Sequence, residues 1–219
     1  MPSNFTKQPQ FLTQKYFNSG TGDATIGGAL TGVPSNVNAG QYNQTLPGDR
    51  LVLSAADALA LSNTTVGTLY GGIYMYVRTN ANSVGTPTIG RLAYWDLTVA
   101  DSQYQVTPDE TGAAGANLIA GVFINTLTKG NSWWICIGGK VLAAFRAVLT
   151  GVPAVGVAAY AAAAGAGADL GKLDVLASGA NPTFAEVGLM QERYVGVAEA
   201  LPVAAASSLI DLRLFLYRL

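Results

Sequence analysis

Paired carboxylates are the main catalytic arrangement still open to this chain, because the sequence contains no histidine. Without imidazole the chain lacks the commonest general base and metal ligand, as well as Ser-His and Cys-His nucleophile pairs. Two acids can catalyse hydrolysis without imidazole. None of the candidate acids belongs to a recognisable motif: Asp96, Asp101, Asp109, Glu110, Asp169 and Asp174. Asp109-Glu110 follows a proline and precedes Thr111-Gly112, which is typical of a solvated turn.

Two further patterns resemble ligand-binding loops without matching them. The segment AAAAGAGADLGK, which ends at Lys172, is glycine-rich like a phosphate-binding loop. Leu173 stands where that motif requires Ser or Thr, and the spacing to the preceding glycine is also wrong. The sequence has no Asp-x-Asp-x-Asp-Gly loop for calcium. We therefore expect no phosphate, calcium or other cofactor site.

Cys136 is the single cysteine, so it cannot form an intramolecular disulfide. With no histidine beside it, one chain cannot assemble a cysteine-based zinc site either. It lies between Ile135 and Ile137, where a small buried hydrophobic residue is expected. The sequence therefore predicts no catalytic residue, no metal ligand and no enzymatic activity.

The low charge of the chain suggests a subunit whose own surface is largely covered by neighbouring proteins. Charged residues make up 11% of the 219 residues, against about 25% in an ordinary soluble protein. Such a surface suits a subunit that is largely covered by its neighbours. The net charge of −1 provides no basic region for nucleic acid, so we expect no nucleic-acid partner.

The region from Ala120 to Phe145 carries the clearest structural pattern and would form the centre of a sheet. Apolar residues run through positions 133–137 and again through 141–145, on either side of Gly138-Gly139 and Lys140. Because glycine adopts positive φ without a steric penalty, this pair predicts a β-hairpin turn between two strands.

The remainder of residues 51–219 shows short apolar runs separated by turns. Expected strands cover residues 69–79, 89–99, 103–107, 155–160, 172–176, 184–187, 194–200 and 209–219. One short helix is expected after Ser54, which would cap it with Asp57 at the third helical position. Gly71-Gly72 marks a bulge or a close backbone approach. The pattern predicts an all-β protein, a small β-barrel or sandwich with at most one short helix.

Trp133 and Trp134 are the most distinctive aromatic pair. Neighbouring strand residues point to opposite faces, so one indole would enter the core. The other would either anchor an interface with a partner or be buried by a second layer of the same domain. Both interpretations remain open from the sequence.

Residues 1–50 differ in composition from the rest and form a candidate N-terminal arm. They are rich in Asn, Gln, Gly, Thr and Pro, and they contain few apolar runs. A disordered tail and an extended arm lying on a neighbouring subunit both fit this composition. The aromatic side chains favour the arm, with Phe5, Phe11, Tyr16 and Phe17 as candidate interface anchors.

No segment of the sequence is a good candidate for membrane contact. The N-terminal MPSNFTKQPQ lacks the apolar stretch of a secretory signal. Residues 147–168 are uncharged but consist mainly of Ala, Gly and Val, with Pro153 and Tyr160 among them. That composition is too weakly apolar for a convincing span. We expect no membrane partner.

The region from Arg91 to Ala200, about half of the chain, resembles the capsid decoration (cement) proteins of tailed bacteriophages. The likeness lies in an ordered series of strands and turns rather than in a signature residue. The series comprises residues 94–96 (YWD), 104–108 (YQVTP), 120–123 (AGVF), 128–131 (TKGN) before a Trp strand, 139–141 (GKV), 149–156 (LTGVPAVG) and 194–200 (YVGVAEA). Residues 1–69 have no counterpart in the usual family pattern.

The resemblance implies a small β-barrel that binds the outer face of a capsid, often as a trimer, and reinforces the shell. It implies the major capsid protein as partner, a virion location after synthesis in the host cytoplasm, and no active site. An alternative is a tail or head-fibre adsorption protein that binds a host surface glycan, which stacked Tyr or Trp beside carboxylates would favour. A third class is an enzyme with two carboxylates facing each other across a cleft.

Overall fold

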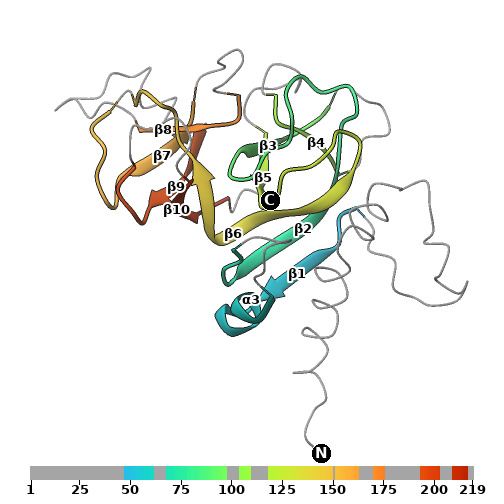
Figure 1. Cartoon of the computed structure of the whole chain (residues 1–219), viewed down its shortest axis with the longest axis horizontal. Coiled ribbons are helices and arrows are strands. Elements are labelled where there is room, and N and C mark those ends of the chain that lie inside the picture. The colour runs from blue at the N-terminus through green and yellow to red at the C-terminus, as the bar shows by residue number, and fades with distance from the viewer. Residues whose placement is uncertain are drawn as a thin grey trace, which may run out of the picture.

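The computed structural model describes residues 47–61, 68–97, 104–109, 118–149, 151–162, 170–175, 193–202 and 209–216 (Figure 1). Within them lie ten strands and the short helix α3. Their bounds are β1 Arg50–Leu53, α3 Ala55–Leu61, β2 Gly72–Thr79, β3 Leu92–Trp95, β4 Gln105–Thr107, β5 Ile119–Phe123, β6 Ser132–Ala144, β7 Ala158–Ala161, β8 Leu173–Val175, β9 Tyr194–Ala198 and β10 Leu209–Leu214. The predicted all-β class is confirmed. The strand predicted over residues 184–187 and the four N-terminal aromatic anchors lie outside the described residues.

Five strands close into a barrel. Neighbouring strands follow the order β2, β4, β3, β5 and β6, and β6 then pairs with β2 to complete the ring. All of these pairings are antiparallel except β2 with β4. Closure leaves few free backbone groups in the ring, which is how short strands form a stable unit.

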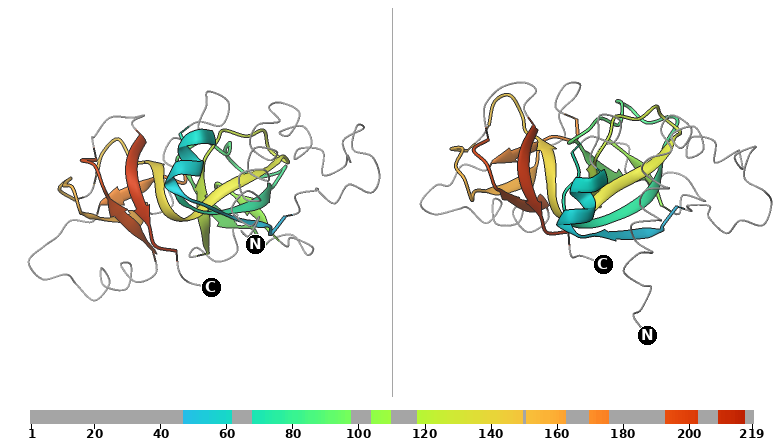
Figure 2. Two further views of the ribbon diagram at one scale, coloured as in Figure 1. Left: turned by 90° about the horizontal axis from the view of Figure 1, so that it is seen from below. Right: turned by 60° about the horizontal axis from the view of Figure 1, so that its bottom comes forward.

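Four further strands, β7 to β10, form a second ring on the other half of β6. β6 pairs with β10, followed by β9, β7 and β8, all antiparallel. A parallel bridge from Leu173 of β8 to Phe145, just after β6, completes the circuit. Figure 2 shows β7–β10 on one side of β6 and β3–β5 on the other.

β6 is therefore one long bent strand that serves both rings, and the predicted hairpin turn at Gly138-Gly139 is wrong. β6 pairs with β2 as far as Gly139, and from Gly139 onward it pairs with β10. The register with β2 shifts just before this point, between Cys136 and Gly138, and Gly139 has a φ of +99°. A glycine at positive φ can bend a strand as readily as it can reverse one, and here it bends β6. The close backbone approach predicted at Gly71-Gly72 is confirmed, because Gly72 pairs with Gly139.

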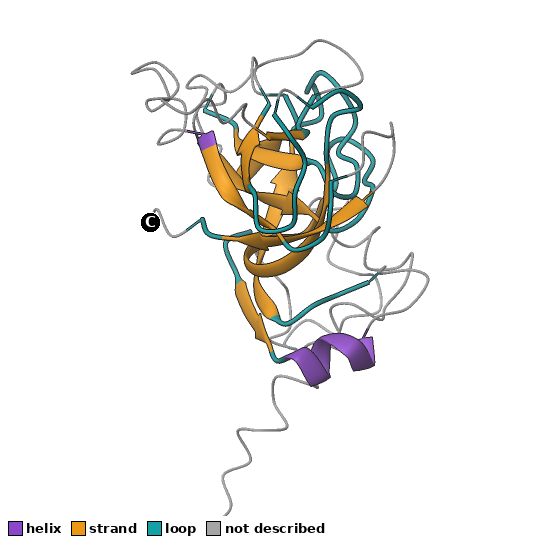
Figure 3. Cartoon of the chain, turned by 90° about the vertical axis from the view of Figure 1, so that its left-hand side faces the viewer, coloured by secondary structure: helices purple, strands orange, loops and turns teal. Residues whose placement is uncertain are grey.

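β1 and α3 form an outlying element beside the barrel. β1 is an edge strand that pairs with β2, and α3 projects from it, as Figure 3 shows. The predicted cap of α3 is confirmed: the Asp57 amide donates to the Ser54 hydroxyl at 3.1 Å, and that hydroxyl donates to the Asp57 carboxylate at 2.7 Å. This reciprocal pairing fixes the start of the helix.

The core runs through both rings along β6. Its fully buried side chains include Tyr74, Tyr94, Phe123, Trp134, Ile135, Phe145, Leu173 and Leu212. The first five come from the β2–β6 ring, and the last three come from the second ring. One continuous cluster thus joins the two rings, which explains why the sequence shows apolar residues on both faces of residues 133–137.

Candidate functional site

The two tryptophans proposed as interface anchors are both inside the molecule. Trp133 and Trp134 are each 2% exposed. They point to opposite faces of β6, and Trp134 packs edge-on against Tyr76 of β2 with ring centroids 5.3 Å apart. Of the two interpretations left open by the sequence, burial of both indoles within one domain is the one observed. Neither indole is available as a surface anchor in this structure.

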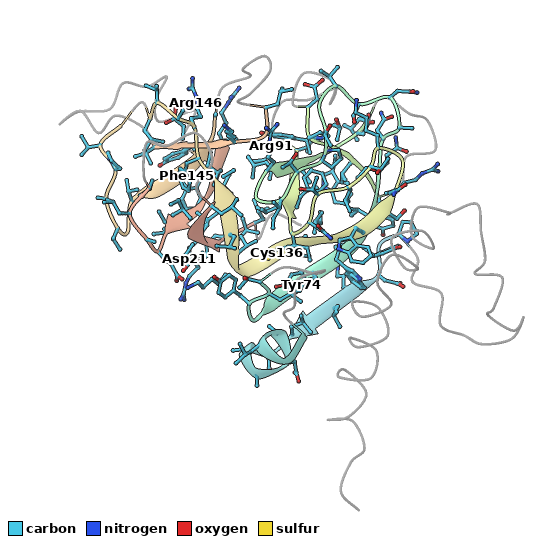
Figure 4. All side chains as sticks on the ribbon, viewed as in Figure 1. Tyr74, Arg91, Cys136, Phe145, Arg146 and Asp211 are labelled. Atoms are coloured by element: carbon cyan, nitrogen blue, oxygen red, sulfur yellow. The ribbon has the colours of Figure 1, made fainter. Side chains whose placement is uncertain are left out.

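The three candidate catalytic acids that the structure describes are engaged in structural contacts. Asp96 is 1% exposed and accepts hydrogen bonds from the side-chain amides of Asn80 and Gln105. Asp109 is equally buried, so the solvated turn predicted from the sequence is wrong for this residue. Asp174 forms an ion pair of 3.1 Å with Arg146, whose place is marked in Figure 4. Asp101, Glu110 and Asp169 lie outside the described residues.

A polar network joins residues of β6 and β10 with Glu199, just after β9, and Tyr70, just before β2; it is the densest cluster of ionisable side chains in the described structure, and it was not predicted from the sequence. The Lys140 ammonium lies 2.8 Å from a carboxylate oxygen of Asp211 and 3.5 Å from one of Glu199. The Arg213 guanidinium donates to Glu199 at 2.6 Å. The Tyr70 hydroxyl donates to Asp211 at 2.8 Å, and the Lys140 ammonium lies 4.8 Å from the centre of the Tyr70 ring.

Strand register assembles this network. Arg213 of β10 is the cross-strand partner of Lys140 on β6, and Asp211 lies two residues earlier on the same face of β10. The Glu199 amide donates to the Asp211 carbonyl at 2.7 Å, which brings the Glu199 side chain to the same place. The alternation of Asp211 and Arg213 with Leu212 and Leu214 was visible in the sequence, but Lys140 and Glu199 are joined to them only by long-range pairing. The labelled Asp211 in Figure 4 lies where the two rings meet.

The pKa shifts of Lys140 and Asp211 favour the charged forms of both side chains. The hydrogen bond to Asp211 raises the pKa of Lys140, although burial acts in the opposite direction. Burial would raise the pKa of Asp211, but hydrogen bonds from Lys140 and Tyr70 outweigh it, so the pKa is lowered. Burial and the hydrogen bond to Asp211 both raise the pKa of Tyr70. The network is therefore a set of stable ion pairs near neutral pH.

Proximity of an amine to a carboxylate raises the question of an intramolecular amide between Lys140 and Asp211. Condensation requires a neutral amine to attack a protonated acid, with loss of water. The two pKa shifts act in the opposite direction, because they favour the ammonium and the carboxylate. The side chains are also 33% and 29% exposed, so water solvates both charges. The arrangement supports an ion pair that ties the rings together.

Cys136 is a buried packing residue, as predicted. It is 0% exposed, and its thiol donates to the carbonyl of Gly138 at 3.5 Å. Burial raises the pKa of the Cys136 thiol to about 12, so the thiolate that would act as nucleophile or ligand is scarce at neutral pH.

One aromatic pair tests the glycan-binding alternative. Trp95 and Tyr104 pack edge-to-face with ring centroids 6.2 Å apart, and Asp96 follows Trp95. The Asp96 carboxylate is buried and already accepts two hydrogen bonds. The Tyr104 ring also lies directly against the backbone of Gly48. Both features give the pair a structural role, so this arrangement does not favour a sugar platform.

Within the ranges that the structure describes, no group of three His, Cys, Asp or Glu side chains could hold a metal ion. No helix in those ranges has the length and apolar character needed to cross a membrane. Neither a protein-family model nor a curated protein matches this sequence.

Proposed function

We propose that this protein is a structural virion protein, a decoration or cement subunit on the outer surface of a tailed-phage capsid. Its partner is the major capsid protein, it assembles as a homotrimer, and it has no enzymatic activity and binds neither nucleic acid nor membrane. It reaches the virion after synthesis in the host cytoplasm. The resemblance of residues 91–200 to the decoration proteins motivates this proposal, and the surface of the structure supports it.

The observation that carries the proposal is an exposed apolar segment between β6 and β7. Val148 and Val152 are each 77% exposed and Val155 is 66% exposed. Residues 147–157 contain no charged side chain. A segment with several highly exposed aliphatic side chains and no charged residue is typical of a surface that is buried in an assembly. We define Val148, Val152 and Val155 as the contact loop.

The mechanism is linkage between binding and shell stability. A subunit that binds the assembled lattice but not its alternatives stabilises the lattice by mass action. Low charge and a rigid two-ring body suit this role, because the subunit needs a surface that matches its neighbours rather than a site for chemistry. The N-terminal arm would extend the contact to adjacent subunits, although residues 48–50 of the predicted arm instead pair with β2.

The first experiment measures binding to capsids prepared without the protein. Val152→Asp and Val155→Asp should weaken co-sedimentation with these capsids by at least about tenfold, because each places a charge in a covered apolar contact. Val84→Asp is the matched control, since Val84 is 62% exposed on a different loop of the β2–β6 ring. Equal binding of all three variants would exclude the contact loop, and absence of binding by the wild-type chain would exclude the decoration role.

The second experiment tests the arm. The deletion should end at residue 46, because the Gly48 amide donates to the Tyr76 carbonyl at 2.7 Å and the Asp49 carbonyl accepts from the Tyr76 amide at 2.9 Å. These residues thus belong to the barrel. The shortened chain should remain folded and bind capsids more weakly. Unchanged binding would contradict the arm.

The third experiment tests the cement role directly. Particles lacking the protein should lose DNA more readily on heating than complete particles do, and adding back the wild-type chain should restore their resistance. Equal loss from both kinds of particle would rule out a reinforcing function.

A further inference from the structure

A strained tyrosine closes over a glycine at the start of β1. Gly48 has a φ of +99°, and a Cβ atom placed on it would lie 2.5 Å from Cε2 of Tyr104. The Tyr104 ring therefore rests on the backbone of Gly48, and Trp95 supports the ring from the side. A side chain at position 48 and the present position of the ring are mutually exclusive.

Tyr104 itself adopts an unfavourable backbone conformation. Its φ is +62°, and among the described residues it is the one non-glycine residue with positive φ. Bulky L-residues adopt this region only when surrounding contacts compensate. Its carbonyl accepts a hydrogen bond of 3.0 Å from the Arg78 amide, which holds its backbone to β2 while the ring covers Gly48.

The element held by this contact is residues 47–61, comprising β1 and α3, which we call the strap. The strap pairs with β2 over the four residues Arg50 to Leu53 and buries Leu51, Leu53 and Ala58. Its outer face is exposed, with Val52 at 65% and Leu59 at 76%. Backbone hydrogen bonds of Gly48 and Asp49 to Tyr76 extend this ladder, but β1 pairs along one edge only, whereas each strand of the β2–β6 ring pairs on both sides.

We infer that Tyr104 and Gly48 form a latch that keeps the strap closed on β2, and that the strap is the part of the barrel built to open. Once the strap separates, the edge of β2 from Gly72 to Met75 loses its partner and becomes free to accept another strand. Opening of the strap is a property of the isolated chain and does not depend on capsid binding.

Hydrogen exchange of the intact chain tests the latch. Gly48→Ala should displace the Tyr104 ring and speed exchange of the amides of residues 50–53 and 72–75 by at least about tenfold. Amides of β9 and β10 should exchange as in the wild type, which separates strap opening from general unfolding. Trypsin cleavage after Arg50, an exposed residue of β1, should accelerate in parallel.

Gly156→Ala is the matched control for backbone strain. Gly156 has a φ of +82°, and nothing lies within 4 Å of a Cβ atom built there. It imposes a comparable left-handed conformation on alanine without a clash, so it should leave exchange in the strap unchanged. Equal exchange in the strap of Gly48→Ala and Gly156→Ala would overturn the latch.

Two Tyr104 variants keep the test decisive if Gly48→Ala fails to fold. Tyr104→Phe retains the ring and should keep the strap closed. Tyr104→Gly relieves the backbone strain and removes the ring, so the strap should open while β9 and β10 stay protected. If the strap of Tyr104→Gly remains as protected as that of Tyr104→Phe, the ring is not a latch and the inference is wrong.

Discussion

A Cβ atom on Gly139 would stand 2.7 Å from the Cα of Gly72, so these two glycines bring the backbones of β2 and β6 into direct contact. The contact lies where β6 leaves one ring and enters the other. No side chain fits between the strands at this point. The bend that joins the two rings therefore depends on glycine at both positions.

Gly139→Ala should be strongly destabilising. Its φ of +99° is unfavourable for alanine, and its Cβ would also lie 2.7 Å from the carbonyl oxygen of Gly71, a backbone atom that cannot move aside. We expect a loss of about 3 kcal/mol or more in the free energy of unfolding, measured by urea denaturation. Gly156→Ala, which has open space around it, should lose only about 1 kcal/mol. Similar losses for both would show that crowding at the bend is unimportant.

Cys136 should be unreactive in the native protein. Its pKa of about 12 and complete burial predict negligible labelling by a thiol reagent at pH 8, followed by rapid labelling in guanidinium chloride. The ratio of the two rates can be read from absorbance of the released chromophore. Rapid labelling of the native chain would mean that this part of β6 opens to solvent.

The Lys140–Asp211 pair should contribute stability that depends on pH. The lowered pKa of Asp211 means that its contribution is present above the unfolded-state value, near 4, and is lost as the pH falls through the folded-state pKa. The raised pKa of Lys140 means that its contribution is lost only in strongly alkaline solution. Asp211→Asn should cost about 0.5–1 kcal/mol at pH 7 and nothing at low pH, where Asp211 is protonated.

A double-mutant cycle separates this pair from other effects of substitution. Lys140→Met and Asp211→Asn should each destabilise at pH 7, and the double variant should lose less than the sum of the two. Additive losses at pH 7 would show that the ion pair makes no measurable contribution.

The same pair should remain non-covalent. The intact mass of the purified chain should equal the mass calculated from its sequence, because charged Lys140 and Asp211 do not condense. A mass lower by one water molecule, absent from Lys140→Met, would instead reveal an amide.

Trp134 should be a major contributor to core stability. It is 2% exposed and packs on Tyr76, so Trp134→Ala should lower the free energy of unfolding by about 3–5 kcal/mol. Leu59→Ala, at a position that is 76% exposed, should change stability by less than about 0.5 kcal/mol. Chemical denaturation followed by far-ultraviolet circular dichroism measures both. A small loss for Trp134→Ala would contradict the assignment of this indole to the core.

The sequence predicted features whose cause is local. The cap at Ser54 follows from residues three positions apart, and the strand at Leu209–Leu214 follows from alternation within the segment itself. The same holds for the structural role of Cys136. Each of these depends on neighbours in the chain, so the residue pattern alone contains the information.

The sequence could not predict features that depend on distant partners. Gly138-Gly139 carries the same local preference whether the strand bends or reverses, and only pairing with β2 and β10 decides between the two. The outward-facing tryptophan could be placed only once both faces of β6 were known to be covered. The polar network was missed because Lys140, Glu199 and Asp211 come from separate strands whose register is set by the whole fold.

The sharing of β6 has a consequence for the order in which the chain folds during synthesis. The strand pairings that close the first ring involve no residue beyond the bend at Gly139, so the ring can close while the remainder of the chain is still on the ribosome. The emerging half of β6 then presents a ready edge on which β10, β9, β7 and β8 assemble. Because translation starts at the N-terminus, β6 is available as an edge before strands β7 to β10 have been synthesised.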